Sequence, residues 1–96
     1  MARIEILVEE PSMKEFLTIL LPNVLNNQWN LNENYFIRSF EGKNDLQKNI
    51  PSKVKFLSNW YHEAVGVVIM EKKDGGMIVD VILVVIQDGT SNIVNH

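Results

Sequence analysis

The chain has 96 residues and a mass of 11.0 kDa, which is the size of one small domain. Hydrophobic residues make up 46% of it and charged residues 22%, which is a globular composition and excludes an intrinsically disordered chain. Twelve acidic and nine basic residues give a formal charge of -3, which argues against a large basic surface for a nucleic-acid backbone but leaves room for a local patch.

The residue types and segments that the sequence lacks exclude further classes of protein. There is no cysteine, so disulfides, thiolate zinc sites and cysteine nucleophiles are excluded. The first residues lack the apolar stretch of a signal peptide, and the longest apolar run, residues 81–86, is far below the roughly 18 residues of a membrane span. We therefore expect a cytoplasmic protein with no membrane segment.

The first predicted element is a strand over residues 3–8. Its alternating positions are Ile4, Ile6 and Val8 on one face and Arg3, Glu5 and Leu7 on the other. Because Leu7 makes the second face apolar near the strand's end, the pattern favours a central strand of an α/β sheet.

A helix is predicted next. Ser12 and Glu15 have the spacing of a capping box, and Pro22 is expected to end or kink the helix, with a last turn at Val24 and Leu25 as the alternative. The apolar stripe predicted to face the core is Met13, Phe16, Leu17, Leu20 and Leu21. The Asn-rich residues 26–34 read as a loop.

A second strand is predicted over residues 35–40, and Gly42 ends it. Residues 43–45 are expected to form a turn, with a cap at Asn44 or Asp45. Pro51 suits the first position of a second helix, with residues 52–61 behind it, because a proline's missing N–H is not needed there.

The last third of the chain favours strands. Residues 65–70 and 77–86 flank the turn signal Lys73-Asp74-Gly75-Gly76, which predicts a hairpin, and the polar tail 87–96 reads as turn. The predicted order is β-α-β-α-β-β. This is an α/β domain with about four strands, in which the first helix connects parallel strands by a right-handed crossover.

Candidate functional residues follow the strand ends. Glu9 and Glu10 come just after the first strand, where α/β sheets bind ligands, and a carboxylate there can hold a hydrated divalent cation or move a proton. The same acids also complement a helix dipole. Lys43, behind the second strand, suits a phosphate as a point charge, or is simply solvated. Asp74 and Asp88 are the other acids at strand ends, and each also suits a turn.

Two segments carry a family resemblance. The first is residues 6–17, ILVEEPSMKEFL, followed by Leu20-Leu21-Pro22, and the second is residues 40–48, FEGKNDLQK, with Pro51 after it. In this order they resemble the N-terminal half of an uncharacterised Toprim-like family, domain of unknown function 4276. The resemblance covers about residues 3–70. It implies a three-layer Toprim-like fold, mainly parallel, in one domain over residues 1–96 that is shorter than the family's pattern.

The resemblance also implies a chemistry. In Toprim domains a glutamate after the first strand is an acid or base in phosphoryl transfer, which matches Glu9, and an Asp-x-Asp after a later strand binds magnesium. Asp74 fits the second Asp if Lys72 stands in the first position, and Asp88 fits it if Ile86 does. Lys43 becomes a phosphate contact, and a nucleic acid or nucleotide becomes the partner. Either placement loses one carboxylate, so the implied metal site is degenerate.

The alternative function is a non-catalytic interaction or oligomerisation module. The apolar strand predicted over residues 77–86 leaves a bare edge in so small a sheet, and such an edge invites pairing with a second copy. We expect a homodimer under either function.

Overall fold

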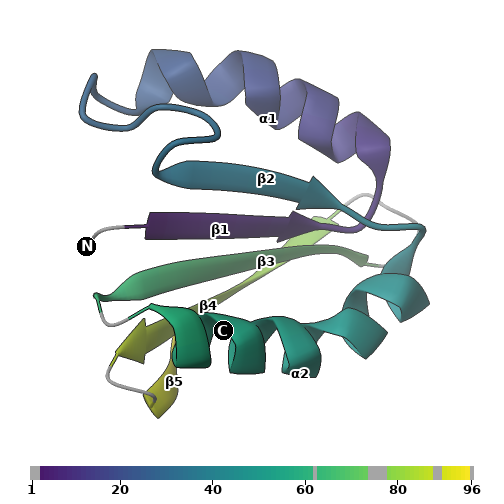
Figure 1. Cartoon of the computed structure of the whole chain (residues 1–96). Helices are drawn as coiled ribbons and strands as arrows, with labels where there is room; N and C mark the ends of the chain where they lie inside the picture. Colours follow the sequence, from purple (N-terminus) through teal and green to yellow (C-terminus); the bar gives the residue numbers. More distant parts are fainter. Residues whose placement is uncertain (1–2, 62, 74–77, 88–89, 96) are drawn as a thin grey trace.

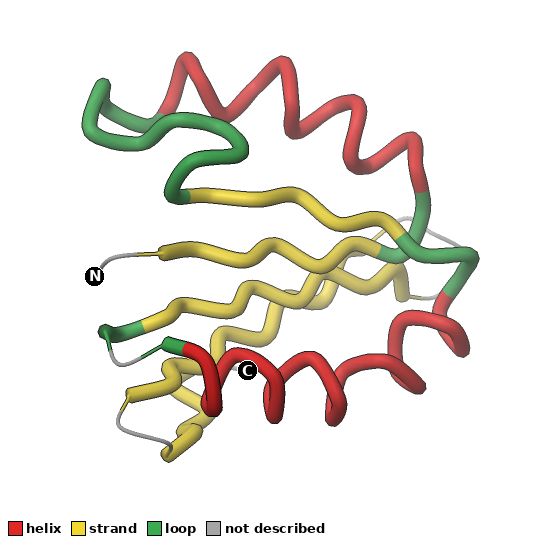
Figure 2. The backbone as a smooth tube through the Cα atoms, in the orientation of Figure 1, coloured by secondary structure: helices red, strands yellow, loops and turns green. Residues whose placement is uncertain are grey.

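A computed structural model describes residues 3–61, 63–73, 78–87 and 90–95. It contains one five-stranded sheet, in the spatial order β2-β1-β3-β4-β5, and two helices (Figures 1 and 2). The elements are β1 (Arg3–Val8), α1 (Pro11–Val24), β2 (Tyr35–Ser39), α2 (Lys43–Trp60), β3 (Val65–Lys73), β4 (Ile78–Gln87) and β5 (Thr90–Asn95).

The sheet has a parallel part and an antiparallel part. β1 lies between β2 and β3 and is parallel to both, whereas β3–β4 and β4–β5 are antiparallel pairs. The α/β class, the order β-α-β-α-β-β as far as β4, and the C-terminal hairpin are therefore confirmed. The predicted turn of that hairpin lies outside the described residues.

One helix covers each face of the sheet, which makes three layers (Figure 1). Ile6 and Val8 of β1 pack under α1, while Leu7 packs under α2, so the central strand is buried on both faces as its alternation predicts. The buried residues on the α1 face are Ile6, Val8, Leu17, Tyr35 and Ile37. Those on the α2 face are Leu7, Leu46, Leu57, Val65, Val67, Ile69, Val84 and Ile86.

The start of α1 differs from the prediction. Because Pro11 occupies the first turn, Glu10 becomes the N-cap residue, and the Ser12 hydroxyl donates to the Glu10 carboxylate at 2.8 Å instead of capping the helix. The helix also continues past Pro22 to Val24. The predicted stripe is only partly buried, because Phe16 and Leu20 are exposed.

The start of α2 was predicted too late. The helix begins at Lys43, and Pro51 lies inside it. Gly42 is the N-cap residue with a φ of 102°, which glycine adopts readily, and the Asp45 carboxylate accepts the Glu41 backbone N–H at 2.9 Å. Leu46 is fully buried in the part of the helix before Pro51, so tertiary packing overrides the local preference of the proline.

The tail also differs from the prediction. Residues 90–95 form β5, which pairs with β4, so β4 is not an edge of the sheet and the edges are β2 and β5. The chain has Asp88-Gly89 between the two strands, and this dipeptide is itself a hairpin signal that identifies the fifth strand in retrospect.

Two neighbouring substitutions in α1 test which of its faces supports the fold. Leu17 is 7% exposed and Ile19 is 74% exposed. We expect Leu17→Ala to lower the free energy of unfolding by about 2–5 kcal/mol, because it leaves a cavity under the helix. We expect Ile19→Ala to change it by less than about 0.5 kcal/mol. Urea unfolding of both variants measures the difference, and equal losses would contradict the packing described above.

Candidate functional site

The carboxyl ends of β1, β2 and β3 lie at one edge of the sheet, since the three strands are parallel (Figure 1). The backbone N–H of Gly42 donates to the carbonyl oxygen of Glu9 at 2.9 Å. This hydrogen bond joins the start of α2 to the end of β1. The segments that carry Glu9 and Lys43 therefore reach the same edge.

Lys72 of β3 contacts both acids of this edge. Its backbone N–H donates to Glu9 Oε2 at 2.5 Å, and its ammonium group forms an ion pair with Glu10 Oε1. The hydrogen bonds from Lys72 and Ser12 to Glu10 hold the pKa of that carboxyl below its usual value. The ammonium group of Lys72 thus compensates the charge of Glu10, and its backbone N–H holds the carboxylate of Glu9.

The other predicted site residues are more scattered. Lys43 is exposed at the first position of α2 and forms no ion pair with another described residue. Glu71, which is buried, accepts a hydrogen bond from Gln47 Nε2 at 3.2 Å. Asp74 and Asp88 lie outside the described residues. Within the described part of the chain, no three His, Asp or Glu side chains are grouped to hold a metal ion.

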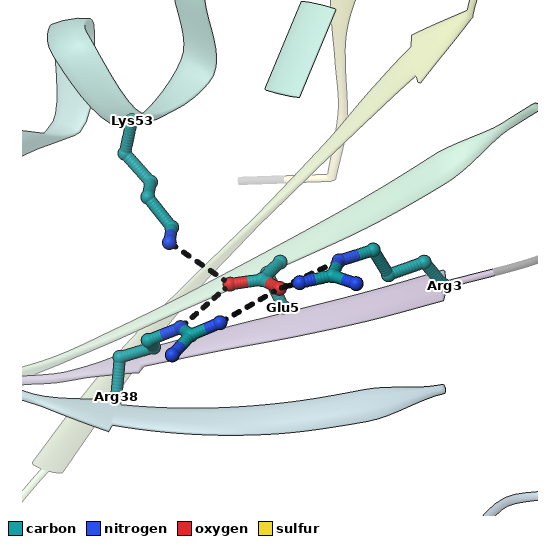
Figure 3. A network of polar contacts seen from close by, with 4 residues as sticks. All are labelled: Arg3, Glu5, Arg38 and Lys53. Atoms are coloured by element: carbon teal, nitrogen blue, oxygen red, sulfur yellow. Dashed lines mark hydrogen bonds and ion pairs between the residues drawn. The ribbon is translucent and has the colours of Figure 1, made fainter. Parts of the chain in front are cut away.

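A second charged cluster lies at the middle of β1, on the α2 face of the sheet (Figure 3). Glu5 is 0% exposed, and three cationic side chains surround its carboxylate. Arg3 of β1 donates from Nε to Oε2 at 2.8 Å, and Arg38 of β2 donates from Nε to Oε1 at 3.0 Å. Lys53 reaches down from α2, with its Nζ 3.3 Å from Oε1.

Aromatic rings hold the arginines of this cluster in place. The Arg3 guanidinium carbon lies 3.9 Å from the centroid of the Phe36 ring and 4.5 Å from that of Tyr61. The guanidinium of Arg38 lies 5.0 Å from the Phe36 ring on the other side of Glu5. These are favourable cation–π distances, and they orient both arginines toward the carboxylate.

The surroundings of Glu5 decide its charge. Burial raises the pKa of the carboxyl group, but the hydrogen bond from Arg38 and the positive charges of Lys53, Arg38 and Arg3 outweigh burial and lower the pKa. Glu5 is therefore an ionised group inside the protein.

The sequence pattern does not predict this cluster. The available signal was a pair of charged residues, Arg3 and Glu5, on a face of β1 that Leu7 makes apolar. The pattern does not reveal the partners, because Arg38 is 33 residues away from Glu5 in the chain.

Comparisons with known proteins give no match: no family model, no curated protein and no solved structure matches the chain. The Toprim-like family and the roles that it implies for Glu9, Lys43, Asp74 and Asp88 therefore stay predictions. Among the described residues, no helix combines the length and the hydropathy that crossing a membrane requires.

The Glu5 cluster predicts a specific response to acid. A carboxyl group whose pKa is lowered by folding contributes stability above its unfolded pKa of about 4.5, and the contribution is lost as the pH falls through the folded pKa. We expect Glu5→Gln to lower the free energy of unfolding at pH 7 by about 3–5 kcal/mol, since it leaves the three cations without a counter-charge. The loss should shrink toward pH 3.

Urea unfolding between pH 3 and pH 7 measures both effects. Glu15→Gln is the matched control, because Glu15 lies exposed on α1 and forms no ion pair with a described residue. A Glu5→Gln variant as stable as the wild type at pH 7 would show that the cluster does not hold the fold together.

Proposed function

We propose that this chain is a degenerate Toprim-like domain of the cytoplasm that acts as a non-catalytic interaction module. One observation carries the proposal, which is that Lys72 engages both Glu9 and Glu10 at the carboxyl edge. The resemblance allows two placements of the magnesium-binding Asp-x-Asp. In the placement that uses Asp74 as the second Asp, Lys72 stands where the family has the first Asp.

The chemistry of phosphoryl transfer explains why a lysine at this position matters. A divalent cation neutralises the charge that develops on the transferred group, and it needs several oxygen ligands that converge on one point. An ammonium group beside Glu10 repels such a cation at close range, and it already supplies the positive charge that the edge acids attract. Glu9 in turn accepts a backbone hydrogen bond from β3, which is a structural role.

Catalysis is the second candidate, and a specific observation favours it. The hydrogen bond between Gly42 and Glu9 brings the Glu9 and Lys43 segments to one edge, as an acid/base and a phosphate contact require. In this alternative, magnesium is held by Glu9 with Asp74 or Asp88, and the substrate is a nucleic acid or nucleotide. The two candidates differ in whether the edge binds magnesium.

The partner that we propose for the interaction module is a second copy of the chain. Exposed apolar residues lie on α1 and on the first half of β4, and we call them the open apolar face: Phe16, Leu20, Val24, Val79 and Val81. Phe16 and Val79 line one groove between the helix and the sheet, so the two parts of the face are continuous. Apolar surfaces of this kind on small domains are typical of protein contacts. The contact thus uses a face of β4 and not the bare edge expected from the sequence.

Magnesium binding separates the two functions. We expect calorimetry with magnesium or manganese to show no saturable binding to the wild type up to millimolar concentration. The variant Lys72→Asp replaces the ammonium by a carboxylate, and we expect it to gain binding that the double variant with Glu9→Gln loses. Saturable binding to the wild type that Glu9→Gln abolishes would instead support the catalytic candidate.

Sedimentation tests the homodimer. We expect the wild type to sediment as a dimer, and Phe16→Glu and Val79→Lys to sediment as folded monomers, because each places a charge in the open apolar face. The control is Lys14→Glu, which changes the charge at an exposed position of α1 outside this face. A monomeric wild type, or a dimer that survives both substitutions, would contradict this contact.

A further inference from the structure

We propose that a pocket between β2 and α2 binds a small organic molecule that carries an oxyanion, a carboxylate or a phosphate, on a flat apolar body. The residues that we assign to binding are Arg38, Phe40, Asn49, Ser52, Lys53 and Phe56, and we call the space that they line the basic pocket. It lies beside the Glu5 cluster and reaches the carboxyl end of β2 at Phe40, on the α2 face of the sheet, and its role is independent of the function proposed above.

The charge of the site is the first reason. Arg3, Arg38 and Lys53 surround a single carboxylate, that of Glu5, and within the described part of the chain none of the three pairs with a second acid. The cluster therefore has an excess of two positive charges in a site that is partly shielded from water. Attraction between charges is stronger in such a site than in bulk solvent, so the excess favours an added anion.

The arrangement of the cations is the second reason. Arg3 is held between two aromatic rings, whereas the side chains of Arg38 and Lys53 are 40% and 22% exposed and line the pocket. Arg38 uses Nε and one terminal nitrogen for Glu5, and a guanidinium has five N–H donors in all. Glu5 thus fixes one side of each cation while the other side faces the pocket, which is the preorganisation that an anion site needs.

The walls of the pocket define the rest of the ligand. The volume is about 450 Å³, within the range of roughly 300–1,000 Å³ for small-molecule sites. Phe40 and Phe56 offer apolar surface, and the hydroxyl of Ser52, which donates to the Asn49 carbonyl oxygen at 3.2 Å, is a polar group of the wall. A planar guanidinium suits the paired oxygens of a carboxylate or phosphate, and the aromatic rings suit a flat body attached to it.

A purely structural cluster is the competing explanation. In that case the three cations serve only to neutralise Glu5 and to hold α2 against the sheet. The position of Lys53 argues against it, because the two arginines already donate hydrogen bonds to both carboxylate oxygens. Lys53 adds a third positive charge beside a single carboxylate, so the pocket wall keeps a net positive charge.

The test uses phenyl phosphate and benzoate as probes, with inorganic phosphate and benzyl alcohol as partial probes. Calorimetry with the full chain should show saturable binding of at least one of the two complete probes. Inorganic phosphate should bind at least tenfold more weakly than phenyl phosphate, and benzyl alcohol should not bind. Whichever complete probe binds more tightly identifies the oxyanion.

Three variants locate the binding. We expect Lys53→Gln and Arg38→Gln each to weaken it at least tenfold. Lys55→Gln removes the same charge from an exposed position of α2 that does not line the pocket, and we expect it to leave binding unchanged. Amide chemical shifts of the wild type should move on addition of the probe in β2 and in the middle of α2.

Several results would overturn the proposal. They are the absence of binding by both complete probes, binding that Lys53→Gln leaves intact, or equal losses in Lys53→Gln and Lys55→Gln. Circular dichroism confirms that each variant is folded before it is titrated. If Arg38→Gln does not fold, Lys53→Gln and the map of amide shifts decide the question without it.

Discussion

Glu5 lies in β1, an interior strand of the sheet, with no exposed surface, and cationic side chains from β1, β2 and α2 close around it. A buried carboxylate without partners costs several kcal/mol, so these three elements must keep their relative positions for the charge to be tolerated. Apolar packing holds α2 on the sheet, but it is compatible with small shifts of the helix. The ion pair between Lys53 and Glu5 is less tolerant, because its energy depends on one short distance.

The open apolar face and the basic pocket both follow from the order of the strands in the sheet. Five strands are covered by only two helices, of which α1 packs on β1 and β2 and α2 packs on β3, β4 and β5. Each helix therefore leaves part of its own face uncovered, and the two uncovered parts are at opposite ends of the sheet. One is the open apolar face over β4, and the other is the basic pocket beside β2.

Local patterns in the sequence predict the elements well where packing and local preference agree. The alternation in β1 and the turn signal after β3 identify a buried strand and a hairpin, and both are present. The prediction is wrong where long-range packing overrides a local rule, as at the start of α2, where the burial of Leu46 places Pro51 inside a helix. Local sequence patterns do not predict the Glu5 cluster at all, because its members are brought together by the topology of the sheet and share no sequence motif.

The carboxyl edge and the Glu5 cluster differ in their balance of charge. At the carboxyl edge the Lys72 ammonium compensates the charge of Glu10, while Glu9 accepts only a backbone hydrogen bond, so the two acids outnumber the cation that pairs with them. At the Glu5 cluster the cations outnumber the acid, so the field is not balanced and extends into the pocket beside Arg38 and Lys53. An anionic ligand gains binding energy beside positive charge that no acid of the protein compensates. The uncompensated positive charge, which favours an anionic ligand, therefore lies at Arg38 and Lys53 between β2 and α2, and not beside Glu9 and Glu10.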